Sequence, residues 1–138
     1  MTHVRTRLPV LAGAVFLACA VTGGCDRSEN AAEGKRVAGG DPARGQALLA
    51  GGAHGCGGCH SIPGVRGAIG VAGPPLAGMA RRGFIAGELP NTPGNLVAFL
   101  QDPPAFVPGT GMPDVRMSLA EARDVAAYLY TLEPPDER

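Results

Sequence analysis

The pentapeptide Cys56-Gly57-Gly58-Cys59-His60 constrains this chain more than any other feature. It spells C-x-x-C-H, the pattern of covalent attachment to a c-type haem. In a helical segment, positions i, i+3 and i+4 share one face, so we expect both thiols and the imidazole to point the same way. The two thiols can then bond the two vinyl groups of the porphyrin, while the imidazole reaches the iron. Gly57 and Gly58 leave the space between the attachment points free.

Two other interpretations of the same residues stay open. A zinc site could combine both cysteines with His54 and His60, although structural zinc sites normally take their ligands from separated pairs. A thiol–disulfide enzyme could use Cys56 and Cys59, but it would be accompanied by a βαβ pattern that this sequence lacks. We interpret His54, which shortly precedes His60, as a solvent-facing loop residue.

The composition indicates a small domain with too few bulky apolar side chains to form a large core of its own. The chain has 138 residues, with 22 Gly, 13 Pro, four Phe, two Tyr and no Trp, which indicates much loop and little bulky apolar volume. Domains of this kind often depend on a cofactor for stability, and a porphyrin would supply the missing volume. Twelve basic and twelve acidic residues are spread along the chain without a dense basic run, so we expect no nucleic-acid partner.

Residues 1–24 have the charged-then-apolar order of a signal peptide, and Cys25 follows directly. Three alternatives stay open for this leader. In the first, Cys25 is lipidated as in bacterial lipoproteins; in the second, cleavage after Ala18-Cys19-Ala20 releases a soluble protein. In the third, the segment remains as an uncleaved membrane anchor, near the lower limit of length for a membrane helix.

All three alternatives put the domain outside the cytoplasm. Residues 25–40 are small and polar, which is typical of a flexible tether. We therefore expect a periplasmic protein that its N-terminus holds at the inner membrane, with a soluble periplasmic protein as the alternative.

Three segments are predicted to be the main helices. Asp41-Pro42 pairs an N-cap with a proline at the first helical position, for a helix to about Ala50. Thr92-Pro93 begins a second helix that ends near Asp102, and the S-x-x-E capping box at residues 118–121 begins a third that Pro134-Pro135 ends. Gly45 lies inside the first helix, which favours close contact with another element there.

No segment has convincing strand alternation, and long loops are expected between residues 62 and 91. The predicted fold is all-α, with three main helices and long loops wrapped around one covalently bound haem c. The predicted domain spans residues 41–133, and residues 134–138 form a C-terminal tail.

With these elements in order, the chain resembles the class I cytochrome c family over roughly residues 41–133. The motifs that carry the resemblance are the helix-one positions Gly45 and Leu49, the attachment site at residues 56–60, G-P-P-L-A-G at 73–78, P-G-T-G-M at 108–112 and A-Y-L at 127–129. The chain is also similar to cytochrome domains that are encoded with, or fused to, haem–copper oxidases.

The resemblance implies a role for several residues. His60 would be the proximal iron ligand, and the carbonyl of Pro74 would accept a hydrogen bond from its imidazole and so fix the ring. Arg82 and Thr110 match positions that contact the haem propionates. Met112 would be the second axial ligand, a soft thioether that raises the reduction potential.

Two other methionines compete with Met112 for that role. Met79 lies near the Gly-rich loop and is interpreted as a core residue, and Met117 precedes the last capping box, where it would serve as a hydrophobic staple. Pro108 and Pro113 bracket Met112 and would stiffen its loop, as a ligand strap requires.

The resemblance implies an electron-transfer protein rather than an enzyme. If His60 and Met112 occupy both axial positions, no position remains for a substrate, and the expected role is to carry single electrons in a periplasmic respiratory chain. The expected partners are a quinol-oxidising complex and a terminal oxidase. A permanently bound cytochrome subunit of an oxidase or dehydrogenase is one alternative, and a haem sensor or enzyme with an open sixth site is another.

Overall fold

The structure is a computed structural model that describes residues 35–134. The leader 1–24, Cys25 with the tether up to residue 34, and the tail residues 135–138 lie outside the described residues, so the predictions about them remain predictions. Within the described range, no helix combines the length and the apolar character needed to cross a membrane.

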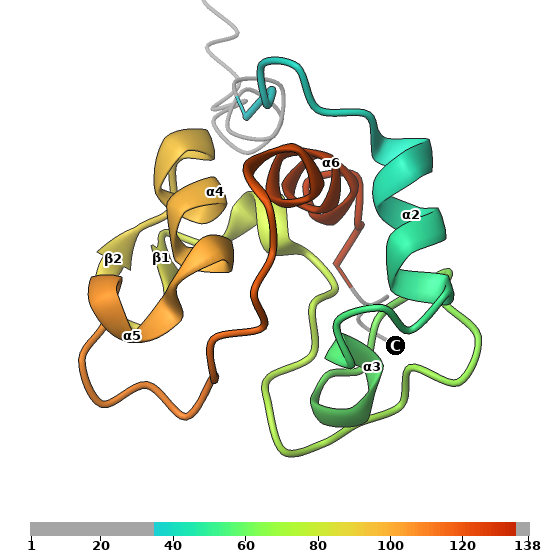
Figure 1. Cartoon of the computed structure of the whole chain (residues 1–138), viewed down its shortest axis with the longest axis horizontal. Coiled ribbons are helices and arrows are strands. Elements are labelled where there is room, and N and C mark those ends of the chain that lie inside the picture. Colours follow the sequence, from blue (N-terminus) through green and yellow to red (C-terminus); the bar gives the residue numbers. More distant parts are fainter. Residues whose placement is uncertain (1–34, 135–138) are drawn as a thin grey trace, which may run out of the picture.

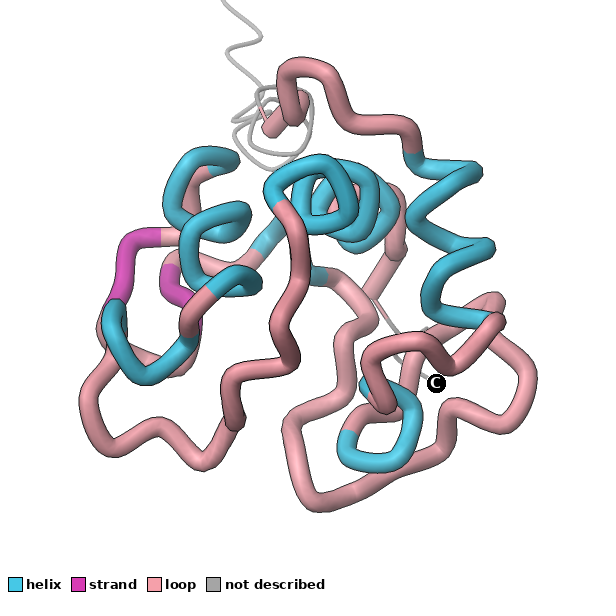
Figure 2. The backbone as a smooth tube through the Cα atoms, in the orientation of Figure 1, coloured by secondary structure: helices cyan, strands magenta, loops and turns pink. Residues whose placement is uncertain are grey.

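Three helices form the upper part of the molecule in Figure 1: α2 (Pro42–Ala50), α4 (Pro93–Gln101) and α6 (Leu119–Leu129). Their positions confirm the three predicted helices. Shorter helical segments interrupt the loops: α3 (Cys56–Cys59), the 3-10 turn η1 (Met79–Arg81) and α5 (Pro103–Phe106). Figure 2 shows that loop and turn make up most of the lower part of the domain.

A short antiparallel ladder was not predicted from the sequence. Strand β1 (Phe84–Ile85) pairs with β2 (Leu89–Pro90), with Phe84 opposite Pro90 and Ile85 opposite Leu89. Two residues a strand are too few for an alternation that a pattern search can detect. The all-α fold class is confirmed, because this ladder of two residue pairs lies entirely within the long loop between residues 62 and 91.

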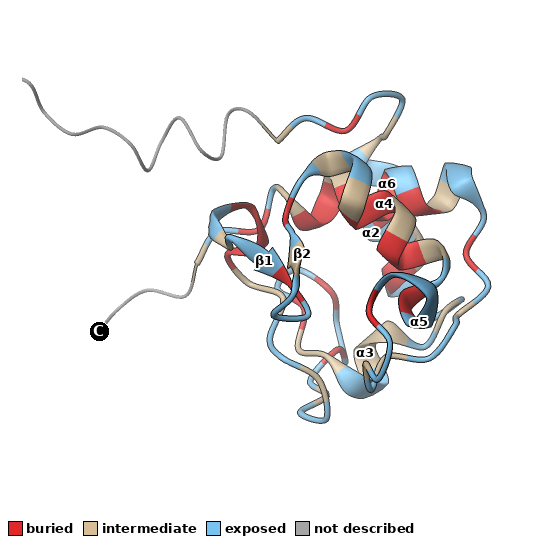
Figure 3. Cartoon of the chain, turned by 90° about the vertical axis from the view of Figure 1, so that its left-hand side faces the viewer, coloured by how far each residue is buried: buried red, intermediate tan, exposed pale blue. Residues whose placement is uncertain are grey.

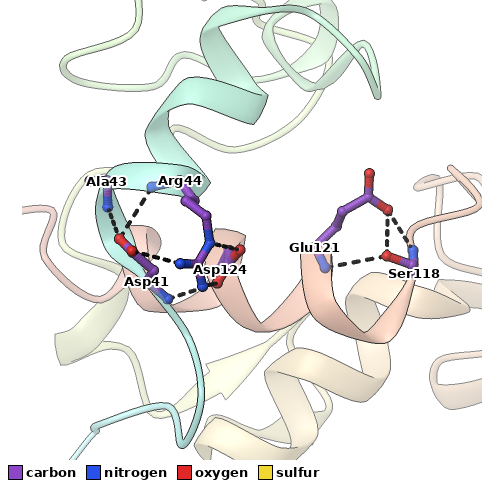
Figure 4. A network of polar contacts seen from close by, with 6 residues as sticks. All are labelled: Asp41, Ala43, Arg44, Ser118, Glu121 and Asp124. Atoms are coloured by element: carbon purple, nitrogen blue, oxygen red, sulfur yellow. Dashed lines mark hydrogen bonds and ion pairs between the residues drawn. The ribbon is translucent and has the colours of Figure 1, made fainter.

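The predicted capping residues begin the three main helices. Asp41 accepts hydrogen bonds from the N–H groups of the first turn of α2, and Thr92 does the same for α4. Ser118 and Glu121 form the reciprocal capping box of α6, which Figure 4 shows. Helix α6 ends at Leu129, earlier than Pro134-Pro135 suggested, and Leu132 is nevertheless buried in the core.

Helix α2 packs against α6 through Gly45, as predicted from its place inside a helix. Gly45 is buried, and a methyl group built on it would overlap the backbone carbonyl of Asp124 and lie 3.0 Å from Cβ of Tyr128. The two helix backbones therefore approach more closely than any side chain at position 45 would allow.

A buried carboxylate ties the start of α2 to α6, as Figure 4 shows. Asp124 accepts hydrogen bonds from the Asp41 N–H at 2.7 Å and from Nε of Arg44 at 2.8 Å. Because the Arg44 guanidinium bonds the charged form, the pKa of Asp124 is lowered from its ordinary value.

The apolar core lies between α4 and α6 and extends to α2. Leu96 and Val125 are the most deeply buried large apolar side chains of these helices, at 2% and 1% exposure. Figure 3 shows the buried positions gathered on the helices, whereas the surrounding loops are mostly exposed. The helices thus form a rigid wall against which the loops enclose a cavity.

Candidate cofactor site

A largely apolar cavity of about 400 Å³ opens between the helices and the loops. The structure brings every predicted cofactor-binding residue to its lining: Cys56, Cys59, His60, Pro74, Arg82, Thr110 and Met112. The rest of the wall is mainly aliphatic and aromatic side chains from α4, α6 and the β1 region. Residues that are more than fifty positions apart in the sequence therefore line one cavity.

The attachment motif begins as a helix, as expected, but His60 does not continue it. Cys56 to Cys59 form α3, whereas His60 has extended backbone angles, with φ −112° and ψ 144°. All three side chains still line the same cavity, so the common direction comes from the turn after α3 as well as from helical spacing. A methyl built on Gly57 would lie 2.9 Å from Cβ of Ala68, so packing under α3 also requires this glycine.

The two thiols have different surroundings. Cys56 is half-buried and Cys59 is exposed. Before a haem is attached, burial raises the pKa of the Cys56 thiol.

The imidazole of His60 is fixed by a hydrogen bond to Pro74. Its Nδ1 donates to the Pro74 carbonyl oxygen at 2.7 Å, which is the contact that the family resemblance predicted. Because Nδ1 carries the proton, Nε2 keeps a free lone pair for a metal. Gly73 lies against this ring, since a methyl there would be 2.6 Å from Nδ1. The loop therefore sets both the rotation and the tautomer of His60.

Met112 lies in the segment that joins α5 to α6, which we call the strap (residues 107–118). It is partly buried, lines the cavity, and its N–H donates to Oγ1 of Thr110 at 3.3 Å. Met79 and Met117 are both 4% exposed, as core residues are. Met79 also borders the cavity, whereas Met117 does not, so the structure leaves Met112 as the accessible thioether on the strap side.

The model of the family described as cytochrome c matches residues 42–133, which is well over half of the chain. The chain belongs to the cytochrome c family. This confirms the class I resemblance and its all-α fold, and membership implies a covalently bound haem c and a role in electron transfer. No curated protein and no solved structure matches the chain.

Arg82 of this cytochrome domain is not a freely solvated side chain. Its guanidinium donates to the carbonyl oxygens of Pro75 and, at 3.1 Å, Ala77, and it also borders the cavity. Arg81, by contrast, is exposed, and within residues 35–134 its ion pair is with Glu133, at 4.0 Å. A propionate at Arg82 would thus meet a guanidinium that the backbone already holds in place.

A buried amide that was not predicted from the sequence, that of Asn91, supports the segment around Arg82. Nδ2 of Asn91 donates to the carbonyl oxygens of Met79 and Arg82, at 2.8 and 2.9 Å, so it bonds both ends of η1. Its Oδ1 accepts from the Tyr130 hydroxyl at 2.8 Å. Burial raises the pKa of Tyr130, so this hydroxyl remains a donor. Asn91 therefore joins the η1 segment to Tyr130, which follows α6, and no local pattern could reveal this role.

The prediction that His54 faces solvent is wrong. Its side chain is 10% exposed, with Nδ1 3.2 Å from the Val115 carbonyl oxygen and Nε2 3.5 Å from Oε1 of Glu121. The strap and the start of α6 cover it. Among residues 35–134, no three His, Cys, Asp or Glu side chains converge as metal ligands do. A zinc site that combines His54 with the attachment motif therefore has no geometric support.

Proposed function

We propose that this protein carries single electrons as a mono-haem cytochrome of a periplasmic respiratory chain, from a quinol-oxidising complex to a terminal oxidase. The observation that carries the proposal is the hydrogen bond from Nδ1 of His60 to Pro74, 2.7 Å long, on the wall of an apolar cavity. It leaves Nε2 as the nitrogen that can bind iron, and it would hold the ring in the same orientation when the haem is bound.

Met112 is the proposed second ligand. It borders the same cavity as His60 but comes from the strap, and Met79 and Met117 are both packed into the core. A thioether is a soft ligand and favours the reduced state, as suits a carrier that accepts electrons from a quinol-oxidising complex. With His60 and Met112 on the iron, no position remains for a substrate, so the proposed role includes no catalysis.

The remaining residues of the cavity have supporting roles. Cys56 and Cys59 would hold the haem through thioether bonds, and Arg82 and Thr110 would bind its propionates. When bound, the haem supplies one-electron exchange between ferrous and ferric iron. With the haem bound, the apolar walls would limit the access of water, and the hydrogen bond to Pro74 would keep the imidazole of His60 in place.

The periplasmic location and the membrane tether rest on the sequence of the leader. Lipidation of Cys25 would confine the carrier to the membrane surface, within reach of membrane-bound partners. This confinement, together with electron transfer by the family, supports the proposed respiratory role.

The ligand assignment is tested with carbon monoxide and two methionine variants. Met112→Leu keeps an apolar side chain of similar volume but removes the sulfur, and Met117→Leu is the matched control on the same strap. The reduced wild-type protein and Met117→Leu are expected to exclude carbon monoxide, whereas reduced Met112→Leu should bind it and turn high-spin before the gas is added.

Either of two results contradicts the assignment. Carbon monoxide binding by the wild-type protein would mean an open sixth site, as in a sensor or enzyme. A Met112→Leu protein that still excludes the gas would mean that another residue is the ligand. Covalent haem is checked separately, because the peptide that contains Cys56 and Cys59 must carry the added haem mass.

A further inference from the structure

His54 connects three parts of the domain that meet beside the cavity. It precedes α3, its Nδ1 contacts the Val115 carbonyl oxygen of the strap at 3.2 Å, and its Nε2 faces Oε1 of Glu121 on α6 at 3.5 Å. The ring is 10% exposed, and Nε2 is a buried atom without a hydrogen bond. Burying a polar ring costs free energy unless its nitrogens are hydrogen-bonded, so the contact of Nδ1 with Val115 offsets part of the cost of burying His54.

The contact with Val115 fixes the direction of the hydrogen bond. A backbone carbonyl oxygen can only accept, so Nδ1 of His54 must carry a proton and donate it. Glu121 is itself held, because its Oε2 accepts from the N–H and the hydroxyl of Ser118 at 2.9 and 2.6 Å. The imidazole therefore lies between a fixed carboxylate and the strap, with little freedom to turn away.

The part of the strap that follows Met112 has few other anchors. Between residues 111 and 117 there is no regular secondary structure, and the hydrogen bonds within it are local, from Met112 to Thr110 and from Arg116 to Asp114. Among residues 35–134, His54 is the residue outside the strap that forms a hydrogen bond with this part. Apolar packing is the other restraint: Met117 is buried, and Met112 and Val115 are partly buried against the core.

We propose that His54 is a positioning residue for the sixth ligand, which holds the strap closed so that Met112 stays on the iron. The hydrogen bond joins the strap to the segment that leads into Cys56, so it ties the methionine side of the site to the attachment side. Loss of the bond would let the strap open more often and expose the iron. This inference rests on the proposed ligation by Met112.

Imidazole binding to the oxidised protein measures that opening directly, because an added ligand enters only when the methionine leaves. The wild type is compared with three variants. His54→Leu removes the donor, and His54→Asn keeps an N–H near the position of Nδ1. Met112→Leu serves as the reference with an open site. Tyr128→Phe is the control for general destabilisation, because it loses one hydrogen bond, to Pro63, far from the strap in sequence.

The expected binding rate for His54→Leu is about threefold to tenfold above that of the wild type, the range that loss of one hydrogen bond allows. His54→Asn should return most of the way to the wild-type rate, and Tyr128→Phe should leave the rate unchanged. A His54→Leu rate equal to that of the wild type overturns the inference. So does an equal increase in Tyr128→Phe, which would show that general loosening is the cause.

The two proposals fail in different ways. If the wild-type protein binds imidazole as fast as Met112→Leu does, methionine ligation itself is wrong. If the wild type is slow and every His54 variant is equally slow, only the role of His54 is wrong. Should His54→Leu not fold, the imidazole-binding rates of His54→Asn and His54→Gln are compared instead. The Gln side chain moves the donor away from Val115, so the His54→Gln protein is expected to bind imidazole faster than the His54→Asn protein.

Discussion

Replacing Gly45 by alanine puts a methyl group against the backbone of α6. The built methyl overlaps the Asp124 carbonyl and lies 3.0 Å from Cβ of Tyr128. A backbone carbonyl cannot rotate away as a side chain can, so α2 must move outward, and overpacking of this kind costs up to about 3 kcal/mol. Alanine returns about 1 kcal/mol through its higher helix propensity. The net expected loss is about 2 kcal/mol.

Urea unfolding of the haem-loaded protein measures this loss, with an expected fall in the midpoint of about 1 M for Gly45→Ala. Gly94→Ala is the matched control, because it makes the same exchange inside α4, where a built methyl has no neighbour within 4 Å. Its midpoint should stay the same or rise. If Gly45→Ala is as stable as Gly94→Ala or more stable, the close contact between α2 and α6 does not require glycine at position 45.

Tyr128→Phe removes the 2.7 Å hydrogen bond to the Pro63 carbonyl, and the free energy of unfolding should fall by about 1 kcal/mol, measured by urea titration. Asp124→Asn should destabilise the protein at pH 7. The Arg44 guanidinium lowers the pKa of Asp124 in the folded protein below its unfolded value of about 3.9. The stabilisation by ionised Asp124 is therefore complete above about pH 4 and is lost as the pH falls through the folded pKa. The difference in urea midpoint between Asp124→Asn and the wild type should shrink below about pH 4. If Cys25 is lipidated, mass measurement of the mature protein should find Cys25 at the N-terminus with the added mass of the lipid; an N-terminal peptide that begins at Met1 without lipid would favour the retained anchor.

The starts of the main helices were predictable because each is encoded locally. Asp41-Pro42, Thr92-Pro93 and the capping box that begins at Ser118 each satisfy backbone donors within three residues, so the sequence alone contains the whole interaction. Gly45 was also predictable, because a glycine inside a helix has a cost that a close contact explains.

The residues that line the cavity were predictable for a different reason. Cys56, His60 and Met112 belong to short motifs in a fixed order, and the family resemblance connects motifs that no local pattern could bring together. Their convergence on one cavity needed the fold.

The missed residues act across the fold. Asn91 bonds carbonyls of Met79 and Arg82, and His54 bonds the carbonyl of Val115, so their partners are backbone atoms, which any residue type provides. A sequence pattern cannot identify such a partner. The extended backbone of His60 was missed because the turn after α3 depends on the loop that contains Pro74.

The absorption spectrum of the oxidised protein at neutral pH tests the central claim, ligation of one haem by His60 and Met112, most directly. Methionine bound to iron(III) gives a weak far-red band. We expect this band in the wild-type protein and in Met117→Leu, and its loss in Met112→Leu. A wild-type spectrum without the band at neutral pH would show that Met112 is not a ligand of the iron.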